Sequence, residues 1–300
     1  MSTATKTTRR NYYRRKSVAK RDLSLDWLRS QISLTDKDRQ TLAILAKHRL
    51  MSIDQLMYWH PDFGRQKRAK ALLQRHINRL HQFYLIDKKD HLYHQQLDGT
   101  TKRTIFVSLG ELGVQAVGWR HYPRRIRYHS NGSVSITPRY YHIARVCDLS
   151  ILTNELFKKM GLEIEWWEVE CKALIGHPNQ LSPDALCVAF DHQTGKRFSF
   201  FIEFDTGSDD VNRKVKFPKL NKKFNRYREV KLWDDFYTSD ISRISANPFP
   251  YLMFVTEEKR RFPLVPRLLE EKKIDASVCM ITDYPGELKK VIERMRKTYA

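Results

Sequence analysis

The chain has 300 residues, of which 55 are Lys or Arg and 34 are Asp or Glu, so its net charge at pH 7 is +21. This length suggests two domains. No apolar run reaches the ~20 residues of a membrane-spanning helix, and the N-terminus lacks the apolar core of a signal peptide. We therefore expect a cytoplasmic protein without a membrane partner.

The four cysteines are widely spaced and form no Cys-x-x-Cys pair; they are Cys147, Cys171, Cys187 and Cys279. Three of them lie in apolar, strand-like runs, which favours buried reduced thiols over disulfides or zinc ligands. The sequence also contains no Gly-x-x-x-x-Gly-Lys-Ser/Thr phosphate loop, so we expect no nucleotide cofactor.

The positive charge is concentrated in the first half of the chain. Residues 1–140 contain 28 Lys and Arg against 10 Asp and Glu, a net charge of +18, whereas residues 141–300 contain 27 against 24, a net charge of +3. A charge gathered in one half indicates a polyanion bound there, most simply DNA or RNA. A membrane surface fits less well, because no basic amphipathic helix with a bulky apolar face accompanies the charge.

Residues 1–33 open the chain with Ser, Thr, Lys and Arg and contain few aliphatic side chains. Such a composition cannot bury enough apolar surface to fold alone, so we predict a disordered basic tail. A tail of this kind can still lie along phosphates when nucleic acid is bound.

Residues 34–119 have the order helix, helix, helix, two strands, helix. Thr35 to Asp38 can cap the first helix, and Ser52 with Gln55 has the spacing of a capping box for the second. The remaining predicted elements are a long helix over 66–83, strands over 84–86 and 103–107, and a helix over 109–117. This order predicts a winged helix-turn-helix domain that binds DNA.

The long third helix separates into a core face and a polar face at 100° per residue. Its core side comprises Ala69, Leu72, Leu73, His76, Ile77, Leu80 and Tyr84. We expect Lys67, Gln74 and Asn78 to face base edges, and Arg68, Arg75 and Arg79 to contact phosphates. The same charge pattern is also found on ordinary solvated helix faces.

Residues 120–140 contain five arginines, two prolines and one Asn-Gly pair, and we interpret them as a basic linker between domains.

Residues 141–300 then alternate helices and strands. The predicted elements are a helix at 142–160, strands at 162–172, 184–190 and 197–205, a helix at 210–231, a strand at 251–256, a helix at 263–273, a strand at 277–282 and a helix at 286–297. This pattern predicts a mixed α/β sheet with helices on its faces.

Two apolar runs within this second domain predict a β-hairpin that carries acidic residues at its rim. Pro183 and Asp184 begin the first run, and the second ends in Glu203, Phe204 and Asp205. Carboxylates in an apolar setting require a neutralising cation. Three of them on adjacent strands can hold one hard divalent cation, which takes oxygen ligands.

Together these segments resemble the replication-relaxation proteins of Gram-positive plasmids and integrative elements. The likeness covers roughly residues 34–285 and is carried by the winged-helix region, the helix beginning at His142, Pro183-Asp184-Ala185, Phe201 to Asp205, and the basic helix that ends near Tyr227. The resemblance implies an α+β winged-helix domain joined to an α/β domain like the PD-(D/E)XK nucleases, acting on plasmid DNA.

The resemblance also implies roles for individual acidic residues. Asp184 and Glu203 match the two acidic residues of the nuclease hairpin and would be Mg²⁺ ligands, and Glu155 on the preceding helix would supply an additional acid. Asp205 stands where a working nuclease usually has lysine, so it could serve only as a further ligand or a base.

A lysine of the following helix would have to replace the missing lysine of the strand. Lys214 and Lys219 are the candidates. The candidate catalytic set is therefore Asp184, Glu203, Asp205 and Lys219.

Two hypotheses for the function remain open. The first is a protein of a plasmid or mobile element that binds the origin region and acts in replication, relaxation or conjugative transfer, with Mg²⁺-dependent nicking and with relaxases or replication proteins as candidate partners. The second is a non-catalytic accessory factor or transcriptional regulator with a degenerate nuclease-like domain. A rolling-circle relaxase fits poorly, because His91 and His94 lack the usual His-apolar-His spacing.

Overall fold

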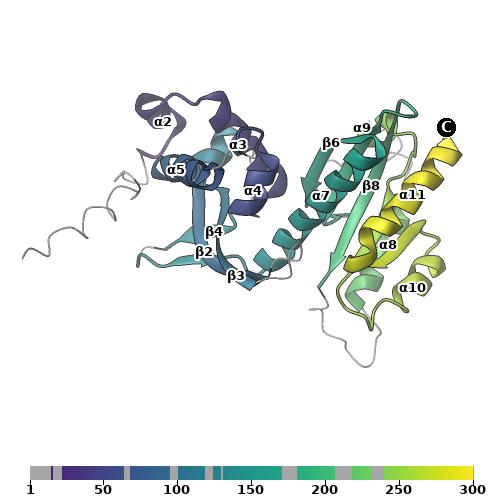
Figure 1. Ribbon diagram of the computed structural model, residues 1–300. Helices are drawn as coiled ribbons and strands as arrows, with labels where there is room; N and C mark the ends of the chain where they lie inside the picture. The colour runs from purple at the N-terminus through teal and green to yellow at the C-terminus, as the bar shows by residue number, and fades with distance from the viewer. Residues whose placement is uncertain are drawn as a thin grey trace, which may run out of the picture. The chain divides into compact units, whose positions relative to one another are not determined.

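A computed structural model describes residues 15, 22–63, 68–94, 101–118, 124–129, 131–170, 181–206, 218–231 and 239–299 (Figure 1). The chain divides into two compact units between Asp148 and Leu149. None of the described helices combines the length and the apolar composition needed to cross a lipid bilayer.

The first unit contains short helices and a small antiparallel sheet. Its helices are α2 (Leu25–Gln31), α3 (Asp36–His48), α4 (Ile53–Trp59), α5 (Ala69–Gln82), α6 (Glu111–Ala116) and the beginning of α7 (Tyr140–Met160). Its strands are β1 (Met51–Ser52), β2 (Ile86–His94), β3 (Thr101–Leu109), β4 (Ile126–Tyr128) and β5 (Val134–Ile136). The main sheet has the order β1-β3-β2, and β4 pairs with β5. The predicted succession of three helices, two strands and a helix is present.

Local hydrogen bonds explain where α3 and α4 begin. The backbone N–H of Thr35 donates to Asp38 (2.8 Å), and the N–H of Asp38 donates back to the Thr35 hydroxyl (3.3 Å). Ser52 and Gln55 make the same reciprocal pair at 2.8 and 3.2 Å. Both caps satisfy backbone donors that the first helical turn leaves unpaired, and both predicted helix starts are confirmed.

The predicted disordered tail is wrong for residues 25–31, which form α2. The hydroxyl of Ser24 caps this helix by accepting from the N–H of Trp27 (3.2 Å), and Leu28 is buried in the core of the unit. The apolar residues of this segment find their burial surface on other helices, which a local composition argument cannot reveal. Residues 1–14 and 16–21 lie outside the described residues.

The predicted basic linker contains strands β4 and β5. Ile126 of β4 is fully buried and pairs with Ile136 of β5, so the apolar residues of this basic stretch have a packing role. The strands β2 and β3 are also longer than predicted. Their polar residues continue the antiparallel pairing from Ile86 opposite Leu109 to His94 opposite Thr101.

Buried hydrogen bonds hold the first turns of α7 within the first unit. The Gln55 side-chain amide donates to the carbonyl of Ala144 (2.7 Å) and to Asp148 (2.7 Å), and the Tyr93 hydroxyl donates to Asp148 (2.7 Å). Burial raises the pKa of Asp148, and these donors act in the opposite direction. The division between the units therefore falls inside α7, beyond the expected linker at 120–140.

The second unit is a mixed five-stranded sheet with helices on both faces. Its elements after α7 are β6 (Leu162–Val169), β7 (Ala185–Asp191), β8 (Lys196–Asp205), α8 (Pro218–Lys231), α9 (Asp240–Ile244), β9 (Tyr251–Thr256), α10 (Val265–Glu271), β10 (Ala276–Met280) and α11 (Tyr284–Tyr299). The strand order is β10-β9-β8-β7-β6. The strands β6, β7 and β8 form an antiparallel meander, and β8, β9 and β10 are parallel to one another. The predicted mixed α and β fold class is confirmed.

Neighbouring residues of β8 point to opposite faces of the sheet and so meet different helices. Phe201 packs edge to face against Tyr227 of α8, with ring centroids 5.6 Å apart. Phe200 packs against Phe157 of α7 at 6.2 Å. Glu203 has the same strand parity as Phe201, so it lies on the face that α8 covers.

The helix α11 lies on the same face as α7. Thr153 of α7 and Tyr284 of α11 share a hydrogen bond of 2.7 Å, and both groups are buried. Phe198, which has the parity of Phe200, packs against Tyr299 at the end of α11. The sheet is therefore sandwiched between α7 and α11 on one face and α8 on the other.

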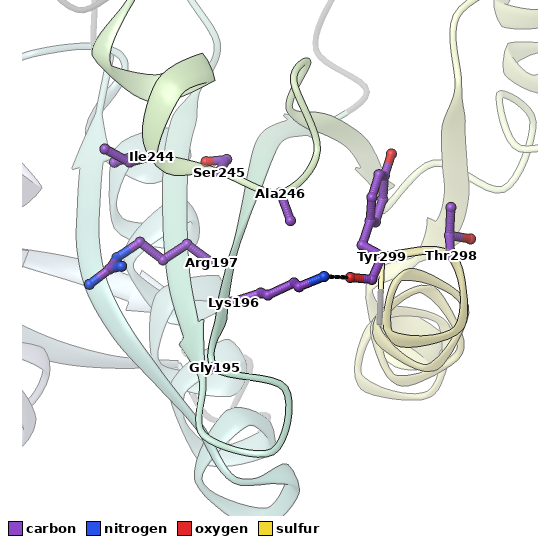
Figure 2. A pocket seen from close by; sticks show the side chains of 8 residues that line it. All are labelled: Gly195, Lys196, Arg197, Ile244, Ser245, Ala246, Thr298 and Tyr299. Atoms are coloured by element: carbon purple, nitrogen blue, oxygen red, sulfur yellow. Dashed lines mark hydrogen bonds between the residues drawn. The ribbon is translucent and has the colours of Figure 1, made fainter.

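A pocket of about 540 Å³ lies at the beginning of β8, beside the ends of α9 and α11 (Figure 2). The Lys196 ammonium donates to the backbone carbonyl of Tyr299 there, as the dashed line shows. The acidic residues Glu203 and Asp205 lie at the opposite end of β8. This pocket is therefore separate from the predicted acidic site.

Candidate functional site

The antiparallel meander brings Asp184 and Glu203 together. Asp184 directly precedes β7, whose first residue Ala185 pairs with Ile202 of β8. One oxygen of Asp184 accepts a hydrogen bond of 2.9 Å from the backbone N–H of Phe204. Both carboxyl groups are buried, with only 6% of Asp184 and 1% of Glu203 exposed.

Two side chains from α8 complete this cluster. The Lys223 ammonium forms an ion pair with Glu203, and it lies 3.6 Å from a carboxylate oxygen of Asp184. The Tyr227 hydroxyl donates a hydrogen bond to Glu203. Lys223 and Tyr227 are one helical turn apart, so they project from the same side of α8. We call these four residues, Asp184, Glu203, Lys223 and Tyr227, the carboxylate cluster.

The electrostatics of the cluster disfavour two ionised carboxylates. Burial raises the pKa of Glu203 well above its usual range; Lys223 opposes this shift, and the neighbouring Asp184 reinforces it. With both acids ionised, a single ammonium would leave one negative charge in a desolvated place, and the raised pKa of Glu203 shows that a proton on this carboxyl is one way to remove it. A cation close to Asp184 and Glu203 would be another way.

Asp205 is held by other partners. Its carboxylate receives the guanidinium of Arg261 at 2.5 Å and the hydroxyl of Thr256 at 3.1 Å, one on each oxygen. Arg261 follows β9 and is only 1% exposed. These bonds give Asp205 a structural task in fixing the loop after β9.

The third predicted ligand lies elsewhere in the unit. Glu155 is exposed on α7, 3.6 Å from Lys158, and α7 covers the face of the sheet opposite to α8. Within the described ranges, no group of three or more His, Cys, Asp or Glu side chains could hold a metal ion. The predicted set of three ligands is therefore reduced to the pair Asp184 and Glu203.

The lysine at the carboxylates is Lys223, one turn after the predicted Lys219. Lys219 belongs to α8, but its side chain is not among the parts of the chain that the structure describes. Lys214 lies outside the described residues altogether. A helical wheel could have found Lys223, because it lies among the apolar positions of α8 and so must point toward the sheet.

The predicted DNA-contact residues of α5 separate into two groups. Arg68 and Arg75 are exposed, and neither forms an ion pair within the part of the chain that the structure describes. Gln74 is half-buried, and Lys67 lies outside the described residues.

The other two predicted contacts are engaged within the unit. The Arg79 guanidinium pairs with the buried carboxylate of Asp38, which completes the capping box of α3 with Thr35. Asn78 accepts a hydrogen bond from the Lys88 ammonium of β2. Arg79 therefore joins α5 to α3.

A buried polar cluster reinforces this junction between helices. The Thr41 hydroxyl lies 2.9 Å from one ring nitrogen of His76 and 3.1 Å from one of His60. Burial lowers the pKa of His76 to about 4, so its ring is neutral at neutral pH. His76 is thus a structural residue at the edge of the core.

Arg15 also has a structural contact that composition did not reveal. Its guanidinium lies 4.0 Å from the ring centre of Tyr128 and 4.7 Å from that of Tyr84, and it pairs with the fully buried Asp87. Arg124 pairs with the same carboxylate at 2.9 Å. Burial raises the pKa of Asp87, whereas both arginines lower it.

A family model described as replication-relaxation matches residues 42–237, which is more than half of the chain. The matched segment includes α5, β2 and β3 of the first unit and the whole carboxylate cluster of the second. No curated protein and no solved structure matches the chain.

Proposed function

Because the chain belongs to the replication-relaxation family, we propose that it binds DNA of a plasmid or mobile element through its first unit and cleaves a phosphodiester with its second. The family itself indicates a role in replication or relaxation of such elements. We place this activity in the cytoplasm, at an origin region, together with a relaxase or replication proteins.

The observation that carries the proposed cleavage is the juxtaposition of Asp184 and Glu203 beside Lys223. Mg²⁺ takes oxygen ligands and is commonly held by one or two carboxylates together with water and substrate phosphates. The pair present here fits that ligand requirement without a third acid. A bound Mg²⁺ would polarise the phosphate and lower the pKa of a coordinated water.

The chain's own residues would orient and stabilise the reacting groups. Asp184 is fixed by the Phe204 N–H and Glu203 by the Tyr227 hydroxyl, so both carboxylates are preorganised. Lys223 would place its ammonium against the charge that develops on the phosphate oxygens. It would thereby perform the task for which Asp205 has the wrong charge.

The proposed DNA contact is supported by the arrangement of the first unit. Helices α3, α4 and α5 precede a β2–β3 hairpin whose sheet is completed by β1, which is the order of a winged helix-turn-helix. In that arrangement α5 would enter the major groove. Arg68 and Arg75 are the exposed cations that it offers to DNA phosphates.

A second candidate function is a non-catalytic DNA-binding accessory factor or transcriptional regulator. The observations that favour it are the ion pair between Asp205 and Arg261 and the neutralisation of Glu203 by Lys223. Under this hypothesis the carboxylate cluster serves as a buried structural ion pair.

Incubation of supercoiled plasmid with the full-length protein, with Mg²⁺ or Mn²⁺ and with EDTA, distinguishes the two functions. Cleavage predicts relaxed or linear product that needs the metal and disappears in Asp184→Ala and Glu203→Gln. Glu155→Ala is the matched control and should keep its activity. A metal-dependent product that persists in both cluster variants would exclude this site, and DNA binding without any product would support the accessory factor.

A further inference from the structure

The helix α8 carries an unbalanced positive charge next to the carboxylate cluster. Six of its 14 residues are Lys or Arg, and Glu229 is its single acid. Its buried row consists of Leu220, Phe224, Tyr227 and Val230. The charge of the helix is therefore carried by the sides that flank this row.

Two cations of α8 form one stripe beside the cluster. At 100° per residue, Lys222 and Arg226 lie within about 40° of each other, and Arg226 lies about 60° from Lys223. Lys222 is exposed and Arg226 is half-exposed. The stripe is thus the solvent-facing neighbour of the side chains that reach Asp184 and Glu203.

Among the described residues, these two cations have no carboxylate partner. Neither Lys222 nor Arg226 forms an ion pair with any residue of the described segments, including Glu229. On helix α11, which covers the opposite face of the sheet, three of the five cations, Lys289, Lys290 and Arg296, pair with carboxylates at 3.9, 3.2 and 2.7 Å.

We infer that Lys222 and Arg226 form a second nucleic-acid contact, which binds backbone phosphates of DNA and aligns the strand with the carboxylate cluster. Phosphates neighbouring the one at Asp184 and Glu203 need cationic partners on the solvent side, and this stripe provides them. Arg226 can bind a phosphate through two N–H donors, and Lys222 acts as a point charge. The inference rests on the proposed function, because the cluster is taken as the place where the phosphodiester is cut.

Salt dependence of binding tests this contact in the full-length protein. The double variant Lys222→Ala/Arg226→Ala and the wild type are titrated with a duplex of arbitrary sequence in EDTA, which prevents cleavage. Loss of two phosphate contacts should reduce the slope of log K against log salt concentration by about 1.8, because each contact contributes about 0.9. The control Lys289→Ala/Lys297→Ala on α11 should leave the slope unchanged, and thermal melting verifies that both variants are folded.

The same titration with a single strand of that sequence should show a reduced slope as well, since phosphates are common to both substrates. An unchanged slope in Lys222→Ala/Arg226→Ala, or an equal reduction in the α11 control, would overturn the inference. A reduced slope in a protein that never cleaves plasmid would retain the contact and reject the nuclease. Metal-dependent cleavage with an unchanged slope would do the reverse.

Discussion

The ammonium of Lys223 forms an ion pair with the carboxylate of Glu203, although the two residues are 20 positions apart in the chain. Glu203 is buried within β8, and Lys223 reaches it from α8 with 28% of its side chain exposed. The pair therefore joins the acid-bearing strand to the basic helix. A lysine in this place compensates one of the two carboxylates, and under the proposed function it would also be close enough to act on a phosphate.

Replacement of Lys223 by Met should strengthen binding of a divalent cation, because the ammonium and the cation compete for the same carboxylates. We expect at least a tenfold lower dissociation constant for Mn²⁺ in Lys223→Met by isothermal titration calorimetry, together with loss of plasmid cleavage. Tyr227→Phe keeps the competing charge and is the matched control. Equal Mn²⁺ affinity in wild type and Lys223→Met would contradict the competition.

Removal of Arg261 should destabilise the protein strongly. Its guanidinium lies 2.5 Å from Asp205, and the two side chains are 1% and 9% exposed, so Arg261→Ala leaves a buried carboxylate without its partner. Breaking a buried pair in this way costs about 3–5 kcal/mol, which urea unfolding measures. The double variant Arg261→Met/Asp205→Asn should recover part of the loss, and failure to do so would show that Arg261 acts through other contacts.

Arg75 and Arg79 should differ although both were expected to bind phosphates. Arg75→Ala should lower the salt slope of DNA binding by about 0.9 and leave stability unchanged, since its side chain is exposed. Arg79→Ala should lower stability by about 1 kcal/mol, because its partner Asp38 is buried while Arg79 itself is partly exposed. Equal effects of the two substitutions on DNA binding would contradict the assignment of Arg79 to the α3–α5 junction.

Acid should destabilise the first unit through its buried histidines. Burial lowers the pKa of His76 and of His81 to about 4, and that of His48 to about 3, whereas an unfolded chain has a histidine pKa near 6.5. Between about pH 6.5 and pH 4 the unfolded state therefore binds protons that the folded state does not. Stability should be fully present above pH 6.5 and fall as the pH drops through this window.

Urea unfolding at pH 7.5 and pH 5 measures this effect. His76→Gln, which keeps a polar side chain of similar reach beside Thr41, should show a smaller difference between the two pH values than the wild type. An equal difference in both proteins would indicate that other groups control the acid sensitivity.

The elements that could be predicted are those whose causes are local. The capping pairs Thr35–Asp38 and Ser52–Gln55 lie within one helical turn, and the apolar run over 251–256 corresponds to β9. The segments that were predicted wrongly depend on distant surfaces. Residues 25–31 form a helix by burying Leu28 against the core of the unit, and Ile126 makes a strand out of an apparent linker by pairing with Ile136.

The sequence by itself determined the order of the helices and strands within 34–119, the concentration of positive charge in the first half, and the placement of Asp184 and Glu203 at the rim of one hairpin. Periodicity, capping and hairpin pairing act over a few residues, so they can be deduced from the chain alone. Only the tertiary structure decided that Lys223 reaches those acids, that Arg79 turns to Asp38, and that Arg261 holds Asp205. The physical reason is that a long cationic side chain pairs with whichever buried carboxylate the packing of distant elements brings within its reach.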